Sequence, residues 1–489
     1  MGDVRIGVVG AGVSGLSAAY QLRRRLGDSA EIVVYESSPR PGGKLRTGPV
    51  PGLEGFSVDE GAEAFRRTAQ MGELLRDLGL ADRVAAPRSG QPLVYAGGAR
   101  HPLPQGTLMG IPTDVAALRG SSLLDAAALE RVAQEADRPT GEPVLGSGED
   151  VAVGALVRDR LGPLVLDRLV GPLLAGVYAG DADQLSVRAT LPGLAEALES
   201  QSSLVRAAGE ALRTARRSGS MPGTGLAAAD APAFVTLLGG LEPMVLALVG
   251  ASRATLRTGL PVREIRPRSS ATGGSLSRWT IVAGSASEIG PSSVEDVDAV
   301  VLATPGTPAA RLLQAHLPAT AQALSELRYA SVAVVTLAYR DVELPAGSGV
   351  LVAVGEGREI KAATFTTQKW PYDRSHGLPD GVTVLRASLG RAGDAAVLQR
   401  TDGELARVVA ADVAAVTPIA SEPFAFRVSR WGGALPQYPP GHVQRVEQLR
   451  RDVAGLPGVA VCGAAYDGVG IPACVSSGMR AADEVVAAL

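Results

Sequence analysis

The sequence predicts an α/β protein, with a parallel sheet flanked by helices, a mixed α+β part and a helical part. Residues 4–9 are a short apolar run of the kind that forms a buried parallel strand. Residues 14–26 carry alanine and leucine at helical spacing, and residues 31–35 form a second apolar run. In this order the three segments predict a βαβ unit.

The totals of the chain restrict the class of protein. With 489 residues it is longer than one core usually serves, so two or three domains are expected. It is 46% hydrophobic and 20% charged, as soluble globular proteins are, and its formal charge of −3 gives no reason to expect nucleic acid. Because no apolar run reaches about 18 residues, we expect no transmembrane segment. We expect a cytoplasmic protein and leave peripheral contact with a membrane open.

The patterns along the rest of the chain predict further elements. We expect a helix at 68–80, strands and loops at 87–113, helices at 113–215, a mobile polar loop at 216–233, a strand and a helix at 234–250, strands at 254–305 and 329–390, and a helix at 402–416. Residues 458–489 predict a strand, a glycine-rich loop and a closing helix. The strand near 460 is expected to share a sheet with the strand that begins at residue 4.

A glycine motif stands between the first strand and the first helix. Gly10, Gly12 and Gly15 form G-x-G-x-x-G, which allows a tight turn, a close approach of backbone to a pyrophosphate, and close helix–strand packing. Glu36 ends the second strand 21 residues after Gly15, where an acid hydrogen-bonds ribose hydroxyls and disfavours a phosphorylated ribose. The combination predicts a dinucleotide site.

Three further stretches resemble the FAD-binding elements of the amine-oxidase superfamily. They are "RPGGKLRT" at 40–47, "DEGAEAF" at 59–65 and "CGAAYDGVGIPACVSSG" at 462–478. The chain departs from the usual pattern at Lys44, where many members have arginine, and at Ala62, where many have proline. With the glycine motif, the resemblance implies FAD contacts at Gly10, Ala11, Gly12, Val13, Ser14, Gly15, Glu36, Ser37, Gly42, Gly43, Lys44, Gly61, Ala62, Glu63, Ala64, Val262, Trp431, Gly463, Val469, Gly470 and Ile471.

Nearly the whole chain resembles the protoporphyrinogen and coproporphyrinogen oxidases. The stretches that carry this likeness include "GVYAGDADQLSVRATLP" at 176–192 and "LPQGTLMGIPT" at 103–113, the latter typical of the bacterial coproporphyrinogen III branch. The resemblance implies oxidation of coproporphyrinogen III by molecular oxygen, in six electrons and with release of peroxide, in haem biosynthesis. It further suggests ferrochelatase as a transient partner.

The same resemblance implies the residues of the substrate site. Arg100 and Lys369 are candidates to pair with propionates, while Gly176, Gly349 and Leu351 match positions that line the porphyrinogen. Because the flavin carries the chemistry, we expect no catalytic side chain and no metal site, and we take His442 as structural. A covalent link through Cys474 is not expected, since a buried cysteine is usually a small hydrophobe.

The resemblance also implies a division into domains. A discontinuous Rossmann-type FAD-binding domain is expected at 1–88, 234–305 and 425–489, a mixed α+β substrate-binding domain at 89–112 and 306–424, and a helical subdomain at 113–215. Other functions stay open at this point. They are a protoporphyrinogen IX oxidase, an amine or carotenoid oxidoreductase, and a porphyrin-binding flavoprotein without catalytic activity.

Overall fold

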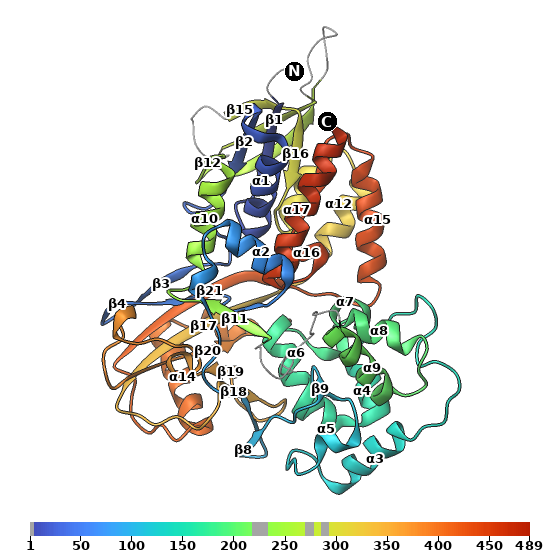
Figure 1. The fold of residues 1–489 in the computed structure, drawn as a ribbon, viewed down its shortest axis with the longest axis vertical. Helices are drawn as coiled ribbons and strands as arrows, with labels where there is room; N and C mark the ends of the chain where they lie inside the picture. Colours follow the sequence, from blue (N-terminus) through green and yellow to red (C-terminus); the bar gives the residue numbers. More distant parts are fainter. Residues whose placement is uncertain (1–3, 218–232, 269–277, 285–292) are drawn as a thin grey trace.

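The computed structural model describes residues 4–217, 233–268, 278–284 and 293–489, and Figure 1 shows them in three parts. A helix-covered parallel sheet lies at one end of the long axis. A second sheet and a group of helices lie side by side at the other end. The sequence predicts a mobile loop at 216–233, and its residues 218–232 lie outside the part of the chain that the structure describes.

The parallel sheet joins segments from both ends and the middle of the chain. Its strands lie in the order β12 (Thr255–Arg257), β2 (Ala30–Tyr35), β1 (Val4–Val9), β16 (Ala299–Leu302) and β22 (Val459–Val461). All neighbouring pairs are parallel. Both the βαβ unit and the placement of the strand near 460 are therefore confirmed. Most residues of these strands are apolar because helices and further strands cover both faces.

Two helices from opposite ends of the chain cover one face of this sheet. They are α1 (Val13–Leu26) and α17 (Ile471–Ala488), which lie side by side in Figure 1. A Cβ atom at Gly478 would lie 2.0 Å from the carbonyl oxygen of Ser14, so the helix backbones approach as closely as glycine permits. Helix α10 (Glu242–Ser252) packs on α1 from the other side.

The second sheet has seven strands, and α14 covers one of its faces. Its order is β21 (Ala425–Pro436), β17 (Tyr329–Arg340), β20 (Val382–Leu389), β19 (Ile360–Thr364), β18 (Gly349–Val352), β7 (Leu93–Ala96) and β8 (Ala99–Pro102). One face forms a core with α14 (Asp402–Val416). Strand β21 pairs with β17, so this sheet includes residues that the expected boundary at 425 places with the FAD-binding part. The domain boundaries stay a prediction.

The helical part forms its own apolar core beside this sheet. It contains α3 (Ala126–Ala136), α4 (Val153–Leu161), α5 (Pro163–Val165), α6 (Gly171–Tyr178), α7 (Val187–Thr190), α8 (Pro192–Leu198) and α9 (Leu204–Arg217). Helix α6 packs on β18 and β19, so it is the helical element nearest to the open face of the seven-stranded sheet.

The remaining helices and strands complete the fold. They are β3 (Thr47–Val50), β4 (Leu53–Asp59), β5 (Phe65–Arg66), α2 (Ala69–Asp77), β6 (Val84–Ala85), β9 (Thr107–Leu108), β10 (Ile111–Pro112), β11 (Phe234–Leu237), β13 (Val262–Pro267), β14 (Trp279–Ala283), β15 (Ser293–Val297), α11 (Gly306–Leu313), α12 (Pro318–Ser325), α13 (Thr366–Lys369), α15 (His442–Ala454) and α16 (Ala464–Asp467). The helix expected at 68–80 is shorter, because Thr68 caps its start and Gly79 adopts a φ of 68° after its end.

Candidate functional site

The first glycine loop shows a separate reason for each glycine. Gly10 adopts a φ of 106°, and a Cβ atom at Gly15 would lie 1.9 Å from the carbonyl oxygen of Gly10. These two glycines make the turn and the close packing possible. A Cβ atom at Gly12 would meet no protein atom within 4 Å, so the backbone there faces open space at the start of α1. That space suits a phosphate group at a helix N-terminus.

Glu36 lies beside this turn at the end of β2. One carboxylate oxygen accepts from the amide of Ala11 at 2.8 Å, and the other accepts from the amide of Ser38 at 2.8 Å. The oxygen facing Ala11 keeps a lone pair for a hydroxyl group. The amide of Leu260 donates to the Glu36 carbonyl, which brings the segment leading to Val262 alongside. The predicted ribose and adenine positions are therefore neighbours.

The second glycine stretch packs directly on the first. The amide of Gly42 donates to the carbonyl of Ala11 at 2.8 Å, and a Cβ atom at Gly43 would lie 3.2 Å from the Cα of Gly12. Lys44 follows. Burial lowers the pKa of Lys44, and no carboxylate in the described part of the chain pairs with it. An uncompensated cation beside an uncapped helix start is an arrangement that fits an anionic dinucleotide.

The third element brings a second helix start to the same place. Helix α17 begins after Gly470, and no side chain of the described residues caps it. Gly463, which adopts a φ of 123°, lies against Ser14 at the start of α1. Cys474 lies in the first turns of α17. Burial raises the pKa of its thiol to about 11, so the thiol is protonated near neutral pH and is a weak nucleophile.

The stretch at 59–65 contains a buried ion cluster. Glu63 accepts from Lys369 Nζ at 2.6 Å and from an Arg386 guanidinium nitrogen at 2.6 Å. Arg386, 7% exposed, also donates to the carbonyl of Gly61 at 2.6 Å. Burial alone would raise the pKa of Glu63, but the charges of Lys369 and Arg386 lower it to about 2. Glu63 is therefore an anion at any physiological pH and is no general base.

Trp431 packs on the same stretch. Its indole N–H donates to the carbonyl of Glu60 at 2.8 Å, and a Cβ atom at Gly61 would lie 3.3 Å from its ring. Glu60 itself pairs with Arg46 at 2.9 Å and with Arg427 at 2.5 Å. These bonds hold the stretch at 59–65 against the edge of the seven-stranded sheet.

A row of small side chains crosses the open face of the seven-stranded sheet. Val334 pairs with Ser388, Ser388 with Ala362, and Ala362 with Leu351. All four are half-buried, and apolar residues beside them on each strand, such as Ala333, Ala387, Ala363 and Val350, are buried in the core with α14. The register of β19 shifts between Ile360 and Ala362, so Lys361 has no paired residue on β20 and does not follow this alternation. We name Val334, Ser388, Ala362 and Leu351 the floor row. Opposite its end, Gly176 of α6 is exposed, and a Cβ atom there would lie 3.9 Å from the Leu351 side chain.

The structure brings some of the predicted substrate residues together and separates others. Gly176 and Leu351 face each other, and Gly349 lies two residues from Leu351 on the same strand. A Cβ atom at Gly349 would lie 2.4 Å from the carbonyl of Ala363, so strand packing alone requires glycine there. Lys369 lies in the ion cluster with Glu63 and is not a free cation.

Arg100 lies apart from this group. It pairs across β7 and β8 with Tyr95, whose side chain belongs to the core with α14. The guanidinium reaches the carbonyl of Val416 at the end of α14, 3.4 Å away. Because cross-strand partners point to one face of a sheet, Arg100 points away from the floor row. Its predicted contact with a propionate has no support in this arrangement.

Sequence reasoning missed Arg386 and, apart from Leu351, the floor row. Arg386 stands in an alternating strand, where a single charged residue on the inward face signals a functional or paired position. Three of the four floor residues are ordinary strand residues, and only their register across four strands shows what they share.

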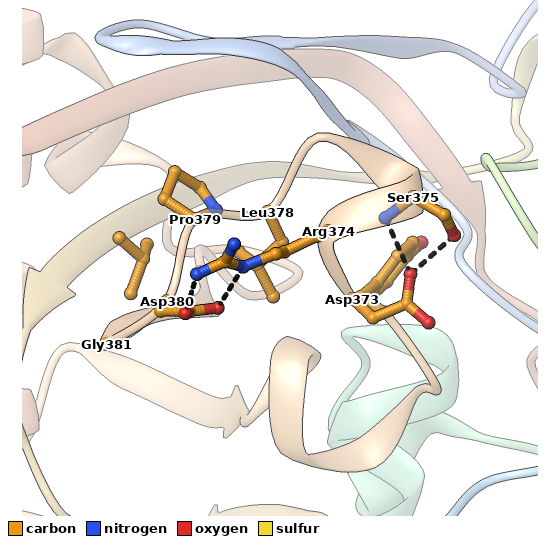
Figure 2. A pocket seen from close by; sticks show the side chains of 9 residues that line it. Asp373, Arg374, Ser375, Leu378, Pro379, Asp380 and Gly381 are labelled. Carbon is orange, nitrogen blue, oxygen red and sulfur yellow. Dashed lines mark hydrogen bonds and ion pairs between the residues drawn. The ribbon is translucent and has the colours of Figure 1, made fainter.

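A separate hollow of about 560 Å³ opens on the loop between α13 and β20, as Figure 2 shows. Arg374 and Asp380 pair with each other across it, and Asp373 accepts from the amide of Ser375 at 2.9 Å. The charged side chains that line it therefore have partners. It contains none of the residues predicted for the cofactor or the substrate.

His442 lies in a packed position. It is 3% exposed and its ring stacks on Tyr438, with centroids 4.4 Å apart. Burial lowers the pKa of His442 to about 4, so its ring is neutral at physiological pH.

No helix in the described part of the chain is both long and apolar enough to cross a membrane.

This chain is similar in sequence to a known protein family and to named proteins over nearly its full length. The family of flavin-containing amine oxidoreductases matches residues 13–486. Coproporphyrinogen III oxidase of Mycobacterium tuberculosis is 39% identical over 493 residues, covering 99% of this chain and 97% of that protein. Human protoporphyrinogen oxidase is 31% identical over 501 residues, covering 98% of each.

A solved structure agrees with these relatives. It is a protein of Exiguobacterium sp. 255-15, provisionally named protoporphyrinogen oxidase, with 30% sequence identity, a TM-score of 0.81 and 99% coverage of both chains. The glycine loops and the family match together show a flavin-dependent oxidoreductase. The chain therefore belongs to the flavin-containing amine oxidoreductases, in the group that holds the coproporphyrinogen III and protoporphyrinogen oxidases.

Proposed function

We propose that this chain binds FAD non-covalently and oxidises coproporphyrinogen III to coproporphyrin III, with molecular oxygen as acceptor. The observation that carries the proposal is the similarity of 39% over essentially the full length to the coproporphyrinogen III oxidase of Mycobacterium tuberculosis. The human protoporphyrinogen oxidase, at 31% identity, represents the second candidate activity.

The residues around the glycine loops fit FAD. The pyrophosphate would lie in the open space at Gly12, against the uncapped starts of α1 and α17, and near Lys44, which no carboxylate of the described residues pairs with. Glu36 would accept from the ribose hydroxyls, and Val262 would lie at the adenine end. The protonated thiol of Cys474 supports non-covalent binding.

The floor row fits a flat macrocycle. Adjacent strands lie about 4.8 Å apart, so the row from Val334 to Leu351 spans roughly 14 Å across three strand spacings. Small side chains let a planar ring system lie against the sheet, and the absence of a side chain at Gly176 leaves room at its edge.

The protein's task in the reaction is to orient the substrate. When bound, FAD supplies two-electron acceptance of a hydride from a meso carbon, and oxygen takes the electrons on as hydrogen peroxide. Three such rounds, each with loss of one hydride and one proton, remove six electrons and six protons in total. The net loss is one hydrogen from each of the four meso carbons and from two of the four pyrrole nitrogens. Glu63, paired with Lys369 and Arg386, holds the stretch at 59–65 in place and moves no proton.

Aerobic porphyrin fluorescence from the purified holoenzyme tests the proposal. Coproporphyrinogen III and protoporphyrinogen IX would be supplied separately, with spontaneous oxidation subtracted. We expect a clear preference for coproporphyrinogen III. A preference for protoporphyrinogen IX would show that the chain is a protoporphyrinogen IX oxidase instead. If the FAD-loaded protein oxidised neither compound, both activities would be refuted.

A further inference from the structure

We propose that Lys361 and Arg391 form a carboxylate-binding site beside the floor row, where β19 begins and β20 ends, and that they hold a propionate of the substrate there. This inference rests on the proposed function and names residues that would recognise a tetracarboxylate. Lys361 belongs to β19 and lies one residue from Ala362 of the floor row. Arg391 lies in the loop that directly follows β20.

The backbone places the two cations together beside the helical part. Lys361 Nζ donates to the carbonyl of Gly390, the residue before Arg391, at 2.5 Å. In the same loop, the amide of Ala392 donates to the carbonyl of Ala179 at 2.8 Å, directly after α6. Because α6 also carries Gly176 against Leu351, the pair lies at the same boundary of helix and sheet as the end of the floor row.

Neither cation has a carboxylate within ion-pair distance among the residues that the structure describes. Lys361 is 3% exposed, and its ammonium group bonds to a carbonyl oxygen. Arg391 is half-buried, and Asp394 and Glu359 act on it only from a longer range. Burial lowers the pKa of both side chains, that of Lys361 to about 7. Two neighbouring cations that lose hydration in this way are costly unless an anion compensates them, and no carboxylate of the described residues lies close enough to pair with either.

The ion cluster beside Gly61 shows the opposite arrangement. There, Lys369 and Arg386 share the carboxylate of Glu63 at 2.6 Å each, so the chain satisfies its own cations. A propionate would have to displace Glu63 to bind them. Lys361 and Arg391 offer the same two kinds of charge without such competition. Arg391 is the accessible member of the pair, and Lys361 is the enclosed one.

Binding and kinetics of single variants test the site. Lys361→Met keeps the volume of the side chain and removes a buried charge, so the variant should fold. We expect Lys361→Met and Arg391→Gln holoenzymes to bind coproporphyrin III at least tenfold more weakly in a fluorescence titration. They should bind its tetramethyl ester as the parent protein does, because the ester has no carboxylate. The KM for coproporphyrinogen III should rise more than kcat falls, and Arg391→Lys should recover part of the affinity.

Arg374→Gln serves as the matched control, because it removes an exposed arginine that pairs with Asp380 far from the floor row. Unchanged affinity for the tetra-acid in Lys361→Met and Arg391→Gln, or an equal loss for acid and ester, would overturn the inference. Failure of the proposed function would appear separately, as a parent holoenzyme that oxidises neither porphyrinogen. The titration would still report whether these two side chains bind a carboxylate.

Discussion

The glycine loops, where we propose that the flavin binds, and the floor row, where we propose that the substrate lies, differ in which groups face the ligand. At the glycine loops the decisive groups are backbone atoms, and the contact that makes the first turn, between Gly10 and Gly15, lies within a few residues. At the floor row the decisive groups are side chains from four strands, between residues 334 and 388. Local geometry therefore prepares the glycine loops, and strand register prepares the floor row.

The largest expected effect separates the two roles of glycine in the first glycine loop. Gly15→Ala would place a Cβ atom 1.9 Å from a backbone oxygen, so we expect loss of flavin and a fall in melting temperature of many degrees. Gly12→Ala meets no protein atom, so the apoprotein should keep its stability while flavin retention falls. Flavin absorbance after gel filtration and thermal unfolding of both apoproteins would measure this. Equal destabilisation by both substitutions would contradict the distinction.

The next effect tests the floor row. Ala362→Phe would fill the space between Ser388 and Leu351, so we expect about a hundredfold lower kcat/KM for any porphyrinogen, with flavin content unchanged. Thr383→Phe is the matched control, because Thr383 pairs with Tyr339 on the face toward α14. Steady-state rates with both variants would decide. Full activity of Ala362→Phe would place the substrate elsewhere.

A smaller effect concerns the ion cluster beside Gly61. In Glu63→Gln, Lys369 and Arg386 lose their counter-charge, and the free energy of unfolding should fall by about 2–3 kcal/mol at pH 7. The pKa of Glu63 falls from 4.5 in the unfolded chain to about 2, so its contribution is complete above pH 4.5 and disappears as the pH falls through 2. Urea unfolding of both proteins between pH 7 and pH 3 should therefore give converging stabilities.

Asp380→Asn controls for the loss of an ordinary ion pair. The pair of Asp380 with Arg374 is exposed and screened by solvent, so its loss should leave the free energy of unfolding nearly unchanged. A difference between Glu63→Gln and the parent protein that is as small, or that grows on acidification, would show that the cluster does not stabilise the fold.

The smallest expected effect concerns Arg100, which the sequence suggested for the substrate site. Because Arg100 points to the face toward α14, Arg100→Gln should change the KM for coproporphyrinogen III by less than twofold. Arg391→Gln measured beside it gives the effect of an arginine near the floor row. A tenfold rise in KM for Arg100→Gln would return Arg100 to the substrate site.

The sequence alone determined the parallel sheet, the glycine turn and the flavin class. A βαβ unit, an acid after the second strand and glycine at Gly10 and Gly15 are local requirements, because each follows from turn geometry and from contacts between neighbouring segments. The helix at 402–416 could be predicted for the same reason, since its spacing and its capping box at Thr401 and Glu404 lie within the segment.

Only the tertiary structure decided which cations are free. Lys369 and Arg100 are both basic residues in segments that resemble a porphyrinogen oxidase, yet one pairs with Glu63 and the other points to the far face of the sheet. Lys361 and Arg391 carry no motif, but they lie together, and no carboxylate in the described ranges is within ion-pair distance of either. The face of a strand residue depends on register, and its charge partner depends on segments hundreds of residues away, so neither can be read from local sequence.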